Sequence, residues 1–244
     1  MIKLELDKVN FIDLTSLLEK TSSSHTKNFL VYPQGEHYKL LAYISSLLNN
    51  AVIFDIGTHH GSSALALSVN KTNKIISYDI LNQCELLMPI SNIELNIGNA
   101  AEDKRLIDAS LILLDTAHDG IYEANFIVHL LNIGYKGILI LDDIFLCPEM
   151  KAVWKAIDLP KYDLTYAGHN TGTGLIDFGN NVIVTESEKW LSDKKILKSF
   201  EKNPFETIKT ELGKTSIPKE IITYILKCIV LKFETEKNIG RKLF

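Results

Sequence analysis

Cysteine is scarce in this sequence, and long apolar runs and a leader-like start are missing. The three cysteines form neither a Cys-x-x-Cys pair nor an even-numbered set. This argues against a disulfide framework and favours free thiols in a reducing compartment. No stretch approaches the roughly 20 apolar residues that a membrane-spanning helix needs. The first ten residues are charged and lack an apolar centre, so we expect no signal peptide. We therefore expect a cytoplasmic protein with no membrane partner.

Neither sign of charge dominates the chain, whose formal net charge is −4. Such a balance gives no overall attraction to nucleic acid. Basic residues do gather in residues 192–244, with 12 Lys+Arg against 7 Asp+Glu. They alternate there with glutamates, as on a solvated helix, and no array of aromatic residues accompanies them. We therefore do not expect a nucleic-acid partner.

Short apolar segments alternate with segments at helical spacing. Strands are predicted at residues 51–57, 74–80, 93–100, 110–117 and 136–144, and helices at 35–50, 62–70, 121–134 and 148–157. This alternation is typical of a parallel sheet covered on both faces by helices. Two further strands, at 162–168 and 174–180, are joined by HNTGT, which is too short for a helix. We predict a Rossmann-like, doubly wound α/β fold with a mostly parallel seven-stranded sheet that ends in an antiparallel strand.

The chain divides into an N-terminal segment, a core and a basic helical extension (1–34, 35–184 and 185–244). Within the first, TSSSHTKN (21–28) is predicted to be a loop. Within the last, IITYILKCIVLKF (221–233) is too apolar to remain in water. It is predicted to pack on the core or on a second subunit, the latter giving a homo-oligomer.

A glycine-containing corner follows the first core strand, in VIFDIGTHHGSSALAL (52–67). Ligands of open α/β sheets bind beyond the carboxyl ends of the strands, where Gly57 and Gly61 would permit a tight turn and close approach of a ligand. Asp79 ends the next strand, 24 residues after Asp55. An acidic residue at about this distance holds the ribose hydroxyls in dinucleotide sites. The pattern predicts a nucleoside site, with a plain tight turn as the alternative.

The corner lacks the G-x-G-x-x-G of Rossmann dehydrogenases, and the sheet is predicted to end in a hairpin. Both features resemble the class I S-adenosylmethionine-dependent methyltransferases, over residues 35–184. In that family an acidic residue precedes G-x-x-x-G, and the sheet finishes with a reversed strand. The resemblance implies S-adenosylmethionine as cofactor. It assigns cofactor-binding roles to Asp55, Gly57 and Gly61 on the methionine side, Asp79 at the ribose, and Asn99 and Ala100 near the adenine.

Two apolar strands end in carboxylates, in LLDTAHDG (113–120) and ILDDI (140–144). If the strands are neighbours, Asp115, Asp142 and Asp143 meet at one edge of the pocket. Converging carboxylates repel one another, and an all-oxygen set selects Mg²⁺ or another hard divalent cation. The alternative is that these residues cap a helix or face solvent.

The same segments resemble the methyltransferase subgroup with D-G-x-H and D-D motifs, which includes metal-dependent O-methyltransferases of the catechol type. The resemblance implies that Asp115, Asp142 and Asp143 hold the metal, although Thr116 replaces the glycine of the first motif. His118 would lie beside the metal and could act as a general base or as a fourth ligand, with a polar loop histidine as the alternative.

Three further histidines lie in loops at this end of the sheet. His169 begins HNTGTG (169–174) and is a second candidate for the catalytic base. His59 and His60 lie between the two glycines, and we expect that these adjacent residues cannot both face a cofactor.

The favoured hypothesis is an O-methyltransferase that acts on a hydroxyl group of a sugar, a glycan or another small molecule. Few aromatic residues are expected around the pocket, whereas HNTGTG and Asn125 offer hydrogen bonds, which favours a sugar. The alternative is a non-catalytic nucleoside-binding or scaffold protein, because a fold does not by itself imply a function. Methylation of an RNA ribose is less favoured.

Overall fold

The structure is a computed structural model, and it describes residues 1–31 and 36–186 of the chain. Residues Met1–Thr185 form one compact unit. The predicted basic extension lies outside the described residues except at its first two positions. Its helices, and a subunit contact through residues 221–233, therefore stay predictions.

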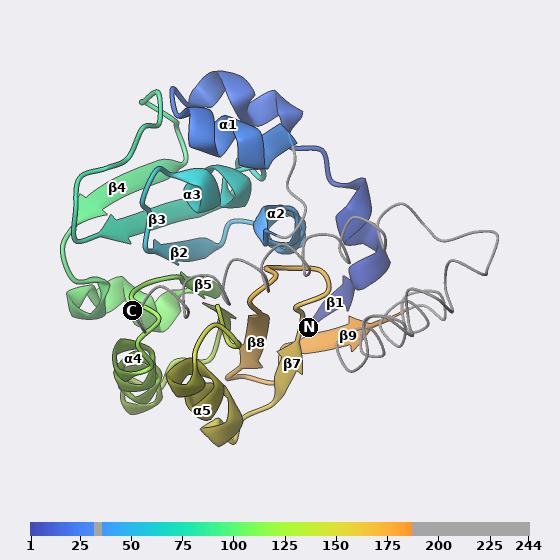
Figure 1. The fold of residues 1–244 in the computed structure, drawn as a ribbon, viewed down its shortest axis with the longest axis vertical. Helices are drawn as coiled ribbons and strands as arrows, with labels where there is room; N and C mark the ends of the chain where they lie inside the picture. Colours follow the sequence, from blue (N-terminus) through green and yellow to red (C-terminus); the bar gives the residue numbers. More distant parts are fainter. Residues whose placement is uncertain (32–35, 187–244) are drawn as a thin grey trace, which may run out of the picture. The chain divides into compact units, whose positions relative to one another are not determined.

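The core of the molecule is one seven-stranded sheet. Its strands are β2 (Val52–Ile56), β3 (Lys74–Asp79), β4 (Ile93–Ile97), β5 (Leu111–Leu114), β6 (Ile138–Asp142), β7 (Lys161–Asp163) and β8 (Thr173–Asp177). They lie in the order β4-β3-β2-β5-β6-β8-β7 (Figure 1). The strands from β2 to β6 pair in parallel, whereas β8 runs antiparallel to both β6 and β7. The predicted Rossmann-like, mostly parallel sheet with a reversed strand is confirmed.

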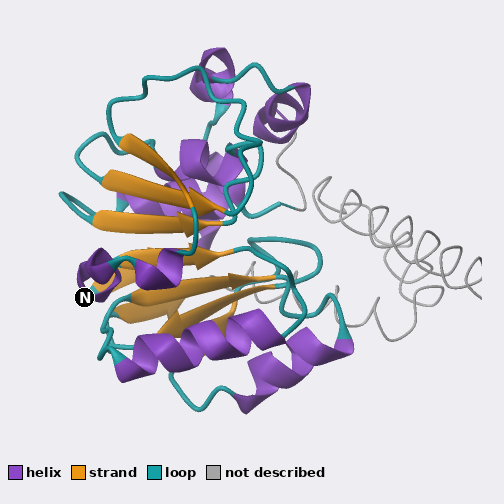
Figure 2. Cartoon of the chain, turned by 90° about the vertical axis from the view of Figure 1, so that its left-hand side faces the viewer, coloured by secondary structure: helices purple, strands orange, loops and turns teal. Residues whose placement is uncertain are grey.

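Helices cover both faces of this sheet (Figures 1 and 2). One face carries α2 (Tyr38–Ser46) and α3 (Ser62–Leu67), and the other carries α4 (Ile121–Asn132) and α5 (Pro148–Ala156). Because both faces are covered, every residue of β5 is at most 1% exposed. Among the described residues, no helix has the length and hydrophobicity needed to cross a membrane.

The helices pack through apolar side chains that alternate along the strands. Phe54 and Ile56 of β2 lie in one buried cluster with Phe126 and Leu130 of α4. Ile53, which directly precedes Phe54, points to the opposite face and is fully buried as well. This packing anchors the strands whose carboxyl ends form the site.

The N-terminal segment differs from the prediction of a loop at residues 21–28. Helix α1 runs from Ser24 to Val31. Its sequence is mostly polar, but two residues one turn apart, Thr26 and Leu30, are buried. The Thr26 hydroxyl lies 2.9 Å from that of Ser62 in α3. A tertiary contact therefore stabilises a helix that local sequence does not favour.

A second, two-stranded sheet joins the ends of the described unit. Strand β1 (Ile2–Glu5) pairs in parallel with β9 (Val182–Thr185), with Ile2 opposite Val182. The remaining short elements are 3-10 helices: η1 (Leu6–Phe11), η2 (Thr15–Lys20), η3 (Ala100–Glu102) and η4 (Lys104–Asp108).

Candidate functional site

A pocket of about 560 Å³ opens at the carboxyl ends of β2, β3, β4 and β5. Its volume is in the range of small-molecule sites. Of the predicted site residues, six line it: Gly57, Asp79, Asn99, Ala100, Asp115 and His118. The other five, Asp55, Gly61, Asp142, Asp143 and His169, lie around it but not on its surface.

The two glycines of the corner are required by the chain itself. Gly57 has φ +101°, and a Cβ at this position would lie 1.6 Å from the carbonyl oxygen of Asp115. Gly61 has φ +94°, and its Cβ would meet the side chain of Leu86 at 2.6 Å. The close approach that excludes a side chain is therefore that of neighbouring chain segments. A role of either glycine toward a ligand stays a prediction.

Asp79 holds the loop that contains the glycines. One of its oxygens accepts a hydrogen bond from the His59 amide at 2.7 Å, and the other accepts one from the Leu81 amide at 2.9 Å. The carboxylate still lines the pocket. Each oxygen has a second lone pair, so Asp79 retains the capacity to accept hydrogen bonds from a pair of hydroxyls.

Asp55 is fully buried beneath the same loop. Burial raises its pKa to about 6, although hydrogen bonds from Ser77 and Ser63 oppose the shift. The Ser77 hydroxyl donates to Asp55 at 2.5 Å and lies 2.6 Å from the hydroxyl of Thr58 in the loop. Asp55 thus supports the loop from below.

The predicted adenine segment forms the wall at the end of β4. Asn99 caps η3, and its side chain accepts a hydrogen bond from the Ala101 amide at 3.1 Å. Ala100 is buried, and Gly98 stands next to open space. A small-residue wall of this kind leaves room for a flat ring.

His59 and His60 both line the pocket, and their ring centroids lie 3.9 Å apart. That they cannot both face a cofactor stays a prediction, and the side chain of His59 is exposed, as expected for a solvated turn. His59 has φ 45°, a left-handed conformation that brings its side chain to the same side as the next one. Burial and the neighbouring His60 and His25 lower the pKa of His59.

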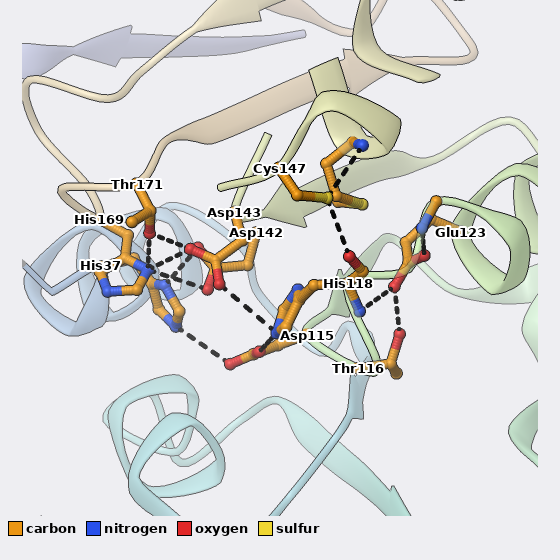
Figure 3. Close-up of polar contacts among 12 residues, drawn as sticks. His37, Asp115, Thr116, His118, Glu123, Asp142, Asp143, Cys147, His169 and Thr171 are labelled. Carbon is orange, nitrogen blue, oxygen red and sulfur yellow. Dashed lines mark hydrogen bonds and ion pairs between the residues drawn. The ribbon is translucent and has the colours of Figure 1, made fainter. Parts of the chain in front are cut away.

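The carboxyl ends of β5 and β6 lie side by side, as predicted, because these strands are neighbours. Asp115, Asp142 and Asp143 therefore lie at one edge of the sheet. They are not bare, however, since each carboxylate faces a histidine nitrogen (Figure 3). The histidines offset part of the repulsion that the sequence predicted.

His118 pairs with Asp115 on the wall of the pocket. Its Nε2 lies 3.2 Å from Asp115 Oδ1, and its Nδ1 is buried with no hydrogen-bond partner. Burial would lower the pKa of His118, but the carboxylates of Asp115, Asp143 and Asp142 together raise it. Burial, together with the nearby charge of Asp142, raises the pKa of Asp115.

Glu123 positions this pair, although its sequence context gave no sign of it. The side chain is fully buried at the start of α4. It accepts hydrogen bonds, each 2.9 Å long, from the Thr116 hydroxyl and from the backbone amides of His118 and Gly120 (Figure 3). A glutamate three residues into a helix signals a cap, but not that it holds a catalytic loop.

Asp142 lies between two histidines, one of which the sequence did not reveal. Its Oδ1 is 3.0 Å from His37 Nδ1, and its Oδ2 is 3.2 Å from His169 Nδ1 (Figure 3). Burial alone would raise the pKa of Asp142, but the two histidines lower it strongly. His37 is 105 residues from Asp142 in sequence, so no local pattern could have paired them.

The pKa values of His37 and His169 are both raised. Burial would lower both pKa values. The Asp142 carboxylate instead raises the pKa of His37 to about 9 and, with Asp143, raises that of His169 further. His169 Nδ1 is also 2.9 Å from Asp143 Oδ1 and 3.1 Å from the hydroxyl of Thr171. The predicted position of the HNTGTG loop, at this end of the sheet, is confirmed.

These features define a Rossmann-like α/β protein with a small-molecule pocket beside a buried cluster of histidines and carboxylates. A scan against protein-family models and a search of curated proteins found no match to the sequence. Solved structures do resemble the chain in three dimensions, at low sequence identity.

One is the SAH-bound methyltransferase PaMTH1 of Podospora anserina, with 14% identity, a TM-score of 0.41, and coverage of 58% of this chain and 77% of that one. A putative caffeoyl-CoA O-methyltransferase of Staphylococcus aureus has 14% identity, a TM-score of 0.45, and coverage of 70% and 99%. An O-methyltransferase of Thermotoga maritima has 14% identity and a TM-score of 0.39. The match covers 57% of this chain and 57% of that protein. At this level of overlap, ligand and chemistry have to be argued from this chain's own residues.

Proposed function

We propose that this protein is an S-adenosylmethionine-dependent O-methyltransferase whose acceptor is a hydroxyl group of a sugar, a glycan or another small molecule. The observation that carries the proposal is that one pocket contains both halves of the chemistry. Asp79 and Asn99 lie on one wall, and the Asp115–His118 pair lies on another. A donor and an acceptor held in the same pocket react with the benefit of proximity.

The pocket has the features that an adenosine group needs. Asp79 can accept hydrogen bonds from two ribose hydroxyls, while Ile80 and Leu81 provide an apolar rim beside it. The wall formed by Gly98 and Ala100 leaves space for the base. S-adenosylmethionine bound there would supply a methyl group activated by the adjacent sulfonium.

His118 is the base in this proposal. The Asp115–His118 pair, joined through Nε2 of His118 at 3.2 Å, would take up the proton of the acceptor hydroxyl from the wall of the pocket. Glu123 fixes the loop and thereby the position of the ring. The donor would give its methyl group to the acceptor oxygen as its carbon–sulfur bond breaks, and His118 would hold the proton that the hydroxyl loses.

The aromatic residues of the pocket bear on the choice of acceptor. Three tyrosines line the pocket, Tyr38, Tyr78 and Tyr122, so the expectation of few aromatic residues was wrong. Asn125 is exposed on α4 and does not line the pocket. The arguments from the sequence therefore no longer favour a sugar over a phenol. Both classes of acceptor are included in the activity test.

A divalent ion is part of the proposal, with Mg²⁺ implied by the family resemblance. Donor atoms for an ion are present in the cluster beside the pocket, where the buried Nε2 of His37 has no hydrogen-bond partner. An ion there would orient acceptor oxygens and lower the pKa of a bound hydroxyl.

The test has two arms. Calorimetry with S-adenosylmethionine and its demethylated product measures donor binding, for which a dissociation constant in the micromolar range is expected. Methyl transfer is then measured on a panel of sugars and catechols, with and without a chelator. His118→Gln should cut turnover at least a hundredfold and leave donor binding intact.

His129→Gln is the matched control for His118→Gln, because His129 lies on α4 away from the pocket. It should leave turnover unchanged. If neither donor form binds at millimolar concentration, the methyltransferase proposal is wrong. Donor binding without transfer to any acceptor would favour the non-catalytic nucleoside-binding alternative.

A further inference from the structure

His37 is the least expected member of the buried cluster. It is 1% exposed, and its Nδ1 faces Asp142. Its Nε2 is also buried but has no hydrogen-bond partner, and the nearest charged oxygen is Oδ2 of Asp115 at 3.9 Å. A buried polar atom without a partner costs about 1–3 kcal/mol. The ring therefore needs an explanation beyond packing.

His169 reaches the same carboxylate from a different element. It comes from the loop between β7 and β8, whereas His37 immediately precedes α2. The two rings approach the two oxygens of Asp142 separately (Figure 3). One ligand atom from each of the three residues lies within 4.8 Å of the others. Within residues 1–31 and 36–186, no other set of three such side chains converges this closely.

We propose that His37, Asp142 and His169 hold one divalent first-row transition ion, such as Mn²⁺, Fe²⁺, Co²⁺ or Zn²⁺. Two imidazoles and one carboxylate suit these ions, whereas Mg²⁺ and Ca²⁺ favour oxygen ligands. The inference deepens the proposed function by naming the ion, and it rests on that function only for the ion's role, not for its binding.

This set shares a single residue, Asp142, with the three carboxylates predicted from sequence. Asp115 is engaged with His118, at 3.2 Å, on the pocket wall. Asp143 and the hydroxyl of Thr171 lie next to His169, at 2.9 Å and 3.1 Å from its Nδ1. The ligand atoms that the fold brings together are therefore both nitrogen and oxygen.

The rival explanation is a hydrogen-bonded core triad with no ion. Such a triad accounts for the Nδ1 atoms of both histidines. It leaves Nε2 of His37 buried without a hydrogen bond, and the ring cannot satisfy both nitrogens through Asp142. An ion would bind one nitrogen of His37, one nitrogen of His169 and an oxygen of Asp142. The ring of His37 or the carboxylate of Asp142 would rotate toward the ion.

The experiment uses the full chain after exhaustive chelation. Co²⁺ and Mg²⁺ are titrated separately by calorimetry, and the visible absorption of Co²⁺ reports its ligands. We expect one Co²⁺ per chain, bound at least a hundredfold more tightly than Mg²⁺, with absorption bands of a nitrogen-ligated ion. His37→Gln and His169→Gln should each weaken Co²⁺ binding at least tenfold, whereas His129→Gln should not change it.

His169→Gln keeps the test decisive if His37→Gln fails to fold, because His169 is partly exposed. The inference is wrong if the wild type binds no Co²⁺, if Mg²⁺ binds equally well, or if the folded variants bind Co²⁺ like the wild type. Donor binding is measured on the metal-free protein. Stoichiometric Co²⁺ without donor binding supports this inference and overturns the proposed function, and the reverse result does the opposite.

Discussion

A Cβ atom at Gly57 would stand 1.6 Å from the carbonyl oxygen of Asp115, across the boundary between β2 and β5. The glycine loop and the carboxyl end of β5 are thus packed backbone to backbone. Because the obstructing atom belongs to the main chain, no side-chain movement can relieve the clash.

Gly57→Ala should therefore lower the free energy of unfolding by more than about 2 kcal/mol. Gly98→Ala is the matched control, since Gly98 also has a positive φ of +143° but no atom within 4 Å of its Cβ position. It should cost only about 1 kcal/mol, from the strain of the backbone conformation. Urea denaturation of both variants measures the difference, and equal losses would show that the contact with Asp115 is not the cause.

Ile80→Ser should weaken binding of the demethylated donor about tenfold, because an apolar contact worth about 1.4 kcal/mol would be lost. Ile80 is 78% exposed and lines the pocket, so the change leaves the core untouched. Ile97→Ser provides the comparison, as Ile97 is 60% exposed and lies outside the pocket lining. Calorimetry that finds the same affinity for both variants would place the base elsewhere.

Asp55 should make stability fall as pH rises. Burial raises its pKa to about 6, whereas the unfolded value is about 3.9. The folded state thus binds the proton more tightly, and its advantage is complete below pH 4 and lost as pH passes 6. Relative to Asp55→Asn, the wild type should lose about 2–3 kcal/mol between pH 4 and pH 7. Urea denaturation at several pH values tests this, and parallel curves for the two proteins would contradict it.

Glu123→Gln should disturb both the loop and the base. An amide NH₂ would replace one of the oxygens that accept from Thr116, His118 and Gly120, so a buried donor would face a donor. We expect a loss of about 2–3 kcal/mol of stability and a fall in turnover larger than the change in donor affinity. Glu149→Gln, at an exposed position of α5, is the control and should leave both unchanged. Wild-type turnover in Glu123→Gln would show that the loop needs no such support.

Much of the fold could be read from local patterns. Strands β2, β3, β5 and β6 are short apolar runs separated by helical spacing, which only a covered parallel sheet accommodates. The short predicted link HNTGT required a reversal of direction, and β8 does run antiparallel to β7. The strand predicted at 162–168 was too long, because β7 ends at Asp163 and residues 164–172 form the link. Asp115, Asp142 and Asp143 could be placed at one edge because parallel neighbours end at the same edge of a sheet.

The contacts that set the chemistry were decided by the tertiary structure. His37 meets Asp142 across 105 residues, and β1 meets β9 across the whole described unit. Neither pairing leaves a periodic trace in the sequence. Helix α1 likewise depends on burying Thr26 and Leu30 against the core. The amino-acid sequence by itself determined which backbone segments become strands and helices, because hydrophobic periodicity is local. Which histidine faces which carboxylate was decided by packing, because that choice depends on segments that only the folded chain brings together.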